Sequence, residues 1–163
     1  MFGIMARIEN LILTVWVGGL ISIGYVAVPV LFKTLEDRSM AGELAGTMFT
    51  VVSVIGAVCG LILLVSMWKN LGKNKFRHWR FWTVIIMLLL VLIGAVVLQP
   101  IMANLKLEGL AEGSEAAAEF GKLHGISAML YMATVILGSI LVMAGSRSKK
   151  TIKTLSDIHE IKD

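Results

Sequence analysis

The sequence predicts an all-α protein, a four-helix transmembrane bundle with up-and-down topology. Three observations predict it: long uncharged apolar runs, charges confined to blocks between those runs, and an uneven distribution of Lys and Arg among the blocks. Of the 163 residues, 57% are hydrophobic and 16% are charged, whereas a typical soluble domain carries about 25% charged residues. The composition therefore indicates a membrane protein.

Four uncharged runs of 23 to 25 residues are present, and about 20 apolar residues suffice to span a bilayer. Because backbone groups in hydrocarbon must be hydrogen-bonded within their own segment, each run predicts a helix. We expect one domain, residues 1–146, followed by a basic cytoplasmic tail, residues 147–163. The expected helices cover about 8–32, 44–68, 81–105 and 123–145.

The basic residues predict the orientation. Eleven of the 15 Lys and Arg residues lie before the first run, in residues 69–80 or in the tail, and four lie in the other two connections. Since cytoplasmic loops are enriched in Lys and Arg, both termini are predicted to be cytoplasmic in a multi-pass protein of the cell (inner) membrane. The net charge of +4 follows from this bias and predicts contact with the lipid bilayer, with no nucleic-acid partner.

Local patterns predict the ends of the helices. Asp37 is placed to cap the helix that follows it, and Ser114 to cap a short surface helix within residues 106–122. Glu9 is expected in the first turn of the first helix, where the helix dipole favours a carboxylate. In the tail, apolar residues recur every three positions among lysines, which predicts an amphipathic segment on an anionic leaflet.

Small and hydroxylated residues form stripes on three of the predicted helices, and we expect these stripes to face inward. The third helix is almost purely aliphatic and is expected to meet the most lipid. Such stripes serve either for helix packing or to line a cavity for a ligand. They comprise Thr14, Gly18, Ser22, Tyr25 and Pro29 on the first helix, Thr50, Ser53, Gly56 and Gly60 on the second, and His124, Ser127, Tyr131, Thr134 and Gly138 on the fourth.

A candidate polar pocket is expected around Gln99, His124 and Tyr131 toward the outer side, whereas Trp16 is expected about two turns from the cytoplasmic end of the first helix. An ionisable residue at membrane depth is a functional candidate, and His124 is the histidine next to an apolar run. Imidazole with a thioether, here Met102, would suit copper, and imidazole alone could ligate haem iron. The candidate ligand-binding residues are Gln99, His124, Ser127, Tyr131, Trp16 and Tyr25, with His124 and Met102 as candidate metal ligands.

The common catalytic motifs are missing: the sequence has no P-loop, no dinucleotide glycine fingerprint, no His-Glu-x-x-His and no Gly-x-Ser-x-Gly. A non-enzymatic role is therefore favoured. The single cysteine, Cys59, excludes an intrachain disulfide and is expected to pack as a small apolar residue.

Short motifs in the first two runs resemble the transmembrane-protein-205-like family, whose bacterial members are described mainly as a domain of unknown function. The motifs are Trp16-Val17-Gly18-Gly19, Pro29-Val30-Leu31-Phe32 and Asp37–Gly42, and Leu123–Ser127 resembles the start of that family's final helix. The resemblance implies a four-helix membrane protein without an established reaction. A fainter likeness to copper-resistance D and HemJ-type membrane proteins implies a histidine-based metal or haem site.

Three hypotheses follow from the sequence. The first is a non-enzymatic bundle that binds or transports a small ligand or a metal. The second is a haem- or metal-dependent membrane redox protein that uses His124. The third is a structural or assembly subunit of a membrane complex, with a homo-oligomer through Gly56 and Gly60 as one form of it.

Overall fold

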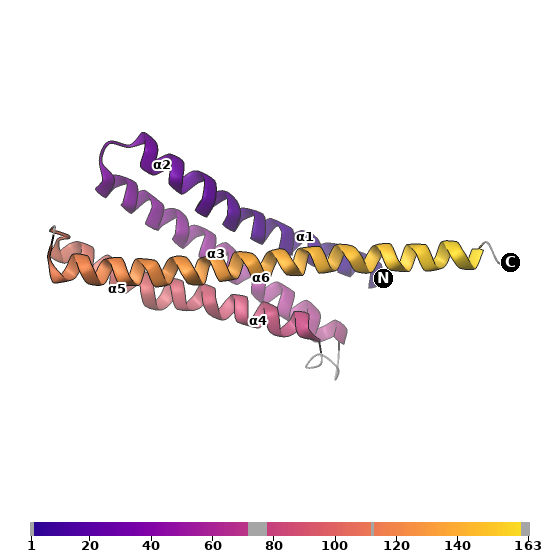
Figure 1. Cartoon of the computed structure of the whole chain (residues 1–163). Helices are drawn as coiled ribbons and strands as arrows, with labels where there is room; N and C mark the ends of the chain where they lie inside the picture. The colour runs from indigo at the N-terminus through magenta and orange to yellow at the C-terminus, as the bar shows by residue number, and fades with distance from the viewer. Residues whose placement is uncertain (1, 72–77, 112, 161–163) are drawn as a thin grey trace.

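The computed structural model describes the backbone of residues 2–71, 78–111 and 113–160, and the side chains of residues 4–69, 78–111 and 113–145. Over this part of the chain every regular element is a helix (Figure 1). Four helical spans are long and apolar enough to cross a membrane: Ile4–Thr34, Arg38–Lys69, Trp79–Glu108 and Glu115–Gly145. The elements are α1 Phe2–Ile21, η1 Ser22–Ala27, α2 Val28–Thr34, α3 Arg38–Leu71, α4 Trp79–Leu92, η3 Ile93–Leu98, α5 Gln99–Glu108 and α6 Glu115–Glu160.

The four spans lie side by side (Figure 1). The connection from α2 to α3 and the connection from α5 to α6 lie at one end of the molecule, which we call the outer end. Both termini lie toward the opposite, inner end (Figure 1). The backbone of α6 continues as a helix to Glu160, whereas the side chains on which the predicted amphipathic tail depends lie outside the described residues.

The first and third spans share a local departure from α-helical geometry. Each contains one six-residue π-helix, η1 or η3, and in each case a proline is the second residue of the helix that follows, Pro29 in α2 and Pro100 in α5. Proline lacks an N–H and its ring clashes with the carbonyl four residues earlier. The wider turn absorbs this defect: the amide just before each proline donates to the carbonyl five residues back, Val28 to Ile23 and Gln99 to Gly94.

The predicted caps are confirmed. The Asp37 carboxylate accepts hydrogen bonds from the amides of Ser39 and Met40 at 2.8 and 3.2 Å, and the Ser114 hydroxyl accepts one from the amide of Ala117 at 3.1 Å. The separate surface helix predicted within residues 106–122 is wrong. The helix capped by Ser114 continues without a break into the fourth span, because good helix formers follow Ser114 and isolated glycines such as Gly121 and Gly125 are tolerated within a helix.

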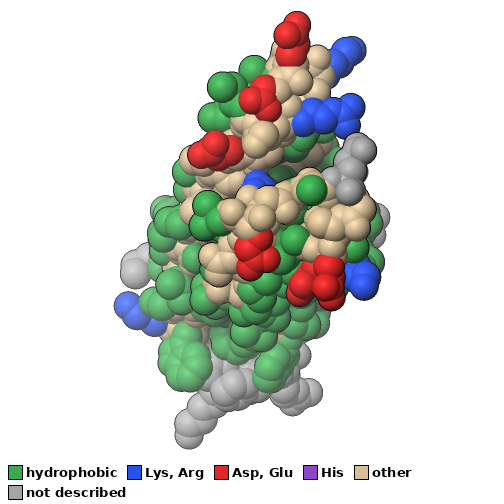
Figure 2. All heavy atoms as spheres, turned by 90° about the vertical axis from the view of Figure 1, so that its left-hand side faces the viewer, with side chains coloured by type: hydrophobic (Ala, Val, Ile, Leu, Met, Phe, Trp, Pro, Cys, Tyr) green, Lys and Arg blue, Asp and Glu red, His purple; other side chains and the backbone are tan. Residues whose placement is uncertain are grey.

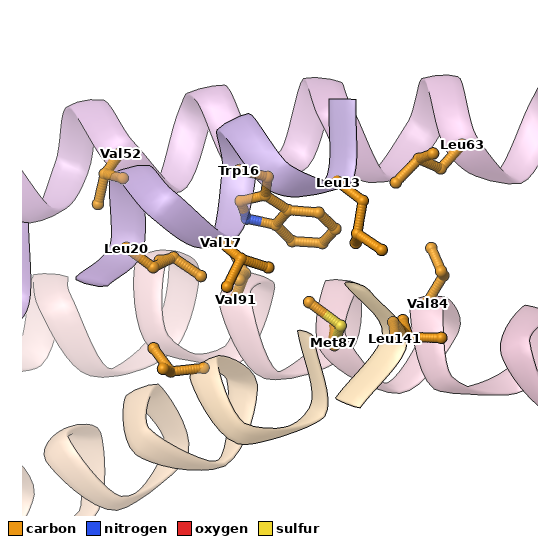
Figure 3. Close-up of a cluster of buried hydrophobic side chains, with 11 residues drawn as sticks. Leu13, Trp16, Val17, Leu20, Val52, Leu63, Val84, Met87, Val91 and Leu141 are labelled. Atoms are coloured by element: carbon orange, nitrogen blue, oxygen red, sulfur yellow. The ribbon is translucent and has the colours of Figure 1, made fainter. Parts of the chain in front are cut away.

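The core is apolar and centres on Trp16, whose side chain is 1% exposed (Figure 3). The indole lies against Gly56 and Gly60 of α3, where an added Cβ would meet the ring. These two glycines therefore serve packing within the chain. Trp16 belongs to a buried apolar cluster to which all four spans contribute: Leu13, Val17, Leu20, Val52, Leu63, Val84, Met87, Val91, Val135 and Leu141.

The expectation that the third span meets the most lipid is wrong. Of the 18 residues that form its most apolar stretch, 39% are buried, whereas 22% are buried in the corresponding stretch of each of the other three spans. Phe81, Val84 and Met87 of α4 point into the core. An aliphatic helix suits the centre of the molecule as well as it suits lipid, because both environments are apolar.

The packing of α1 predicts different effects on stability for two glycine substitutions. Gly56→Ala should lower the free energy of unfolding by about 1–3 kcal/mol, because the new methyl group overlaps the indole of a packed core. Gly18→Ala should change it by no more than about 0.5 kcal/mol, because a Cβ there meets no atom within 4 Å. Reversible unfolding in detergent measures both, and equal effects would contradict the packing.

Candidate functional site

Two polar centres interrupt the apolar interior, one toward each end. At the inner end, the Ser66 hydroxyl of α3 donates to the Glu9 carboxylate at 2.6 Å, and Arg80 of α4 donates to the Asn10 side chain at 3.4 Å. All four side chains are half-buried. We call Glu9, Asn10, Ser66 and Arg80 the inner polar cluster.

The expected role of Glu9 in a first turn is wrong, because α1 begins at Phe2. Glu9 instead joins α1 to α3 through Ser66. Asn10 also contacts α6: a Cβ at Gly145 would overlap its side-chain amide. The cluster therefore fixes the inner ends of all four spans relative to one another. The half-buried Glu9 carboxylate is tolerated there because the Ser66 hydroxyl donates a hydrogen bond to it.

The second polar centre lies at η1 in the first span. The Tyr131 hydroxyl of α6 donates to the carbonyl of Leu20, directly before the wide turn. Its ring lies against Gly24, where a Cβ would overlap it, and packs edge-on against Phe49 at 5.2 Å between ring centroids. Insertion of a side chain into a helix's hydrogen-bond ladder is a recognised cause of helix kinks. The Tyr131 hydroxyl thus binds the main chain at the end of α1, next to η1, so it already has a partner.

The first-helix stripe faces away from the core, contrary to prediction. Each of its five members is exposed, and the Tyr25 side chain is 50% exposed. The Thr14 hydroxyl donates to the carbonyl of Asn10 in its own helix, whereas the hydroxyls of Ser22 and Tyr25 bond to no group in the described part of the chain. We call Thr14, Gly18, Ser22, Tyr25 and Pro29 the outward stripe.

The fourth-helix stripe faces the core only over its inner part. Ser127 and Tyr131 are half-buried, Thr134 and Gly138 are buried, and His124 is exposed. The second-helix stripe behaves similarly: Thr50 is exposed, Ser53 is half-buried, and the glycines are buried under Trp16. The predicted interior lined by polar groups of three helices is therefore wrong. Of the polar groups that reach the interior, the Thr134 hydroxyl donates to the Leu130 carbonyl of its own helix at 2.9 Å, whereas the Trp16 Nε1 is buried without a hydrogen-bond partner among the described residues.

At the outer end, His124 stacks on Phe120 of the same helix, with ring centroids 5.9 Å apart. Lys106 of α5 lies 5.6 Å from the centroid of that Phe120 ring and donates to the carbonyl of Gly42 in α3 at 3.2 Å. Lys106 thereby links three spans. Acidic and basic side chains are both spread over this end of the molecule (Figure 2).

The remaining predicted site residues differ in their surroundings. Gln99 is half-buried at the start of α5 and Met102 is buried. Trp16 is enclosed by the core, so its ring faces cannot receive a planar ligand in this arrangement. Among the described residues no three His, Cys, Asp or Glu side chains lie close enough together to hold a metal ion. Cys59 packs against the core, as predicted.

The sequence reasoning missed three contacts: Glu9 with Ser66, Lys106 with Gly42, and Tyr131 with Leu20. The first could have been suspected, because a serine and a carboxylate lie at the inner ends of adjacent helices. The other two use main-chain carbonyls, which no sequence pattern marks.

The two tyrosines of the chain provide a matched pair for testing the η1 centre. Tyr131→Phe should lower the free energy of unfolding by about 0.6–1.5 kcal/mol, because the hydrogen bond to the Leu20 carbonyl is lost. Tyr25→Phe should change it by less than about 0.5 kcal/mol, because the exposed Tyr25 hydroxyl bonds to nothing within the described residues. Unfolding in detergent gives both values, and a larger loss for Tyr25→Phe would refute this assignment.

Comparison with known proteins assigns the chain to a family. Neither the curated proteins nor the solved structures contain a significant match to it, so no named relative supports the likeness to the transmembrane-protein-205-like or copper-resistance D and HemJ-type proteins. A family model described as a domain of unknown function (DUF4149) matches residues 11–111, which covers Trp16, the outward stripe and both prolines. Because the match extends over more than half of the chain, the protein belongs to the DUF4149 family.

Proposed function

We propose that this DUF4149 protein is an integral membrane protein that acts as an assembly subunit, through contacts that its first span makes in the plane of the membrane. The observation that carries the proposal is the outward stripe: five small, hydroxylated or aromatic residues in helical register, all turned away from the core. We place the spans as an up-and-down bundle in the cell (inner) membrane with both termini cytoplasmic. The Lys and Arg distribution supports this orientation.

The depth of the outward stripe makes a protein partner more favourable than lipid. Ser22 precedes Lys33 by 11 residues, so it lies about 16 Å below that charged end, close to the middle of a ~30 Å hydrocarbon layer. A hydroxyl without a hydrogen-bond partner is costly in hydrocarbon. A second helix that packs on the stripe would supply acceptors for Ser22 and Tyr25.

The shape of the stripe suits a close helix contact. Gly18 is exposed and a Cβ there would meet no atom within 4 Å, so the backbone of α1 is open to a neighbour. Small residues at such positions let membrane helices approach closely. The buried residues around Trp16 pack against one another within the chain, so the outward stripe remains available for contact with a second helix.

A small-ligand or metal site at the outer end is the alternative candidate, and His124 supports it. The imidazole is exposed, and it stacks on Phe120 with its edge nitrogens unoccupied by any hydrogen bond within the described residues. Copper or haem iron would suit such a ligand.

Site-specific photo-crosslinking in living cells tests the assembly role. p-Benzoylphenylalanine in place of Tyr25 should give an adduct of one defined mass, because the position faces the proposed partner. The matched control is Val96, which precedes Pro100 by four residues as Tyr25 precedes Pro29 and is 67% exposed. That position should give no protein adduct above background. An adduct of twice the monomer mass would identify a homo-oligomer.

Two leucine substitutions separate loss of contact from loss of fold. Gly18→Leu should abolish the adduct without changing the melting temperature, whereas Gly125→Leu, also exposed with open space around it, should leave the adduct intact. Equal adducts from positions 25 and 96, or none from position 25, would contradict the proposal. A stoichiometric metal or a Soret band that disappears in His124→Ala, without an adduct, would favour the outer-end alternative.

A further inference from the structure

The surface of α3 carries a hollow near the inner end of the second span. Its volume is about 320 Å³, and it is lined by Leu64, Val65, Trp68 and Lys69. The lining residues come from two successive turns of one helix, so the hollow is shallow. The hollow opens to the outside of the molecule, so it suits part of an elongated molecule better than a compact one.

The chemistry of the lining changes along the helix. Leu64, Val65 and the 55%-exposed Trp68 present apolar surface, and the exposed Lys69 follows them at the end of the apolar span Arg38–Lys69. Two further tryptophans, Trp79 and Trp82, are exposed at the start of the next span. Indole rings favour the boundary between hydrocarbon and headgroups, so the hollow spans that boundary with a cation on its polar side.

We propose that this hollow binds one anionic glycerophospholipid, with part of an acyl chain against Leu64, Val65 and Trp68 and the phosphate beside the Lys69 ammonium group. The apolar lining alone would accept any membrane lipid. The positive charge of Lys69 selects an anionic headgroup, because a basic side chain near the membrane surface attracts anionic lipid. The site is independent of the outward stripe, which lies on the first span.

Fluorescence quenching by brominated lipids tests the site in the full-length protein. The variant Trp79→Phe/Trp82→Phe retains Trp16, which is enclosed in the core, and Trp68, which lines the hollow. Quenching by acyl-chain bromines therefore reports on Trp68. The vesicles consist of unbrominated phosphatidylcholine with a small mole fraction of one brominated lipid. Brominated phosphatidylglycerol should quench the Trp68 fluorescence as strongly as brominated phosphatidylcholine does at an about fivefold higher mole fraction.

Substitutions added to the Trp79→Phe/Trp82→Phe variant test which residue causes the preference for the anionic lipid. Lys69→Gln should remove it and Lys69→Arg should keep it, whereas Lys122→Gln, an exposed lysine at the outer end, should have no effect. Val65→Phe should weaken quenching by both lipids, because the larger side chain fills the apolar lining without entering the core. Equal quenching by the two lipids before substitution, or a preference that survives Lys69→Gln, would overturn the proposal.

Discussion

The packing of the Trp16 indole against Gly56 and Gly60 is the contact on which the rest of the structure depends. A large ring on α1 meets two residues without side chains on α3, so the two helices approach closely while the interior stays filled. In a bilayer, helices gain little from burying apolar surface and associate mainly through such fitted contacts. With Trp16 at the centre, the five residues of the outward stripe face away from the core.

The two π-helices are the second constraint, and each follows from a proline. Pro29 and Pro100 cannot donate a hydrogen bond, and in both spans the wide turn directly before the proline re-forms the ladder five residues back. The wide turn at η1 also receives the Tyr131 side chain from α6. In hydrocarbon, a main-chain group that loses its helical hydrogen bond must find another partner. The hydrogen bond from Tyr131 to the Leu20 carbonyl next to η1 therefore also links the first and fourth spans.

The sequence was sufficient for the spans and the caps, because these depend on local composition and on backbone geometry. It was insufficient for the direction in which each stripe faces. In a soluble protein an apolar face marks the interior, but lipid is as apolar as the core, so Thr14, Gly18 and Ser22 look the same whether they face inward or outward. For the same reason, the aliphatic sequence of α4 did not indicate that this helix is more buried than the others. The contact between Glu9 and Ser66 depends on how two helix ends meet, which requires the tertiary structure.

The arrangement of the four spans depends on Trp16 being enclosed in the core, away from both lipid and water. The most direct test of this enclosure is quenching of Trp16 fluorescence in the variant Trp68→Phe/Trp79→Phe/Trp82→Phe, in which Trp16 is the only tryptophan. The structure predicts blue-shifted emission that neither aqueous acrylamide nor lipids brominated near the chain ends quench appreciably, because the side chain is 1% exposed. Strong quenching by the lipids would place Trp16 on the lipid-facing surface, and strong quenching by acrylamide would reveal a water-accessible cavity; either result would contradict the account.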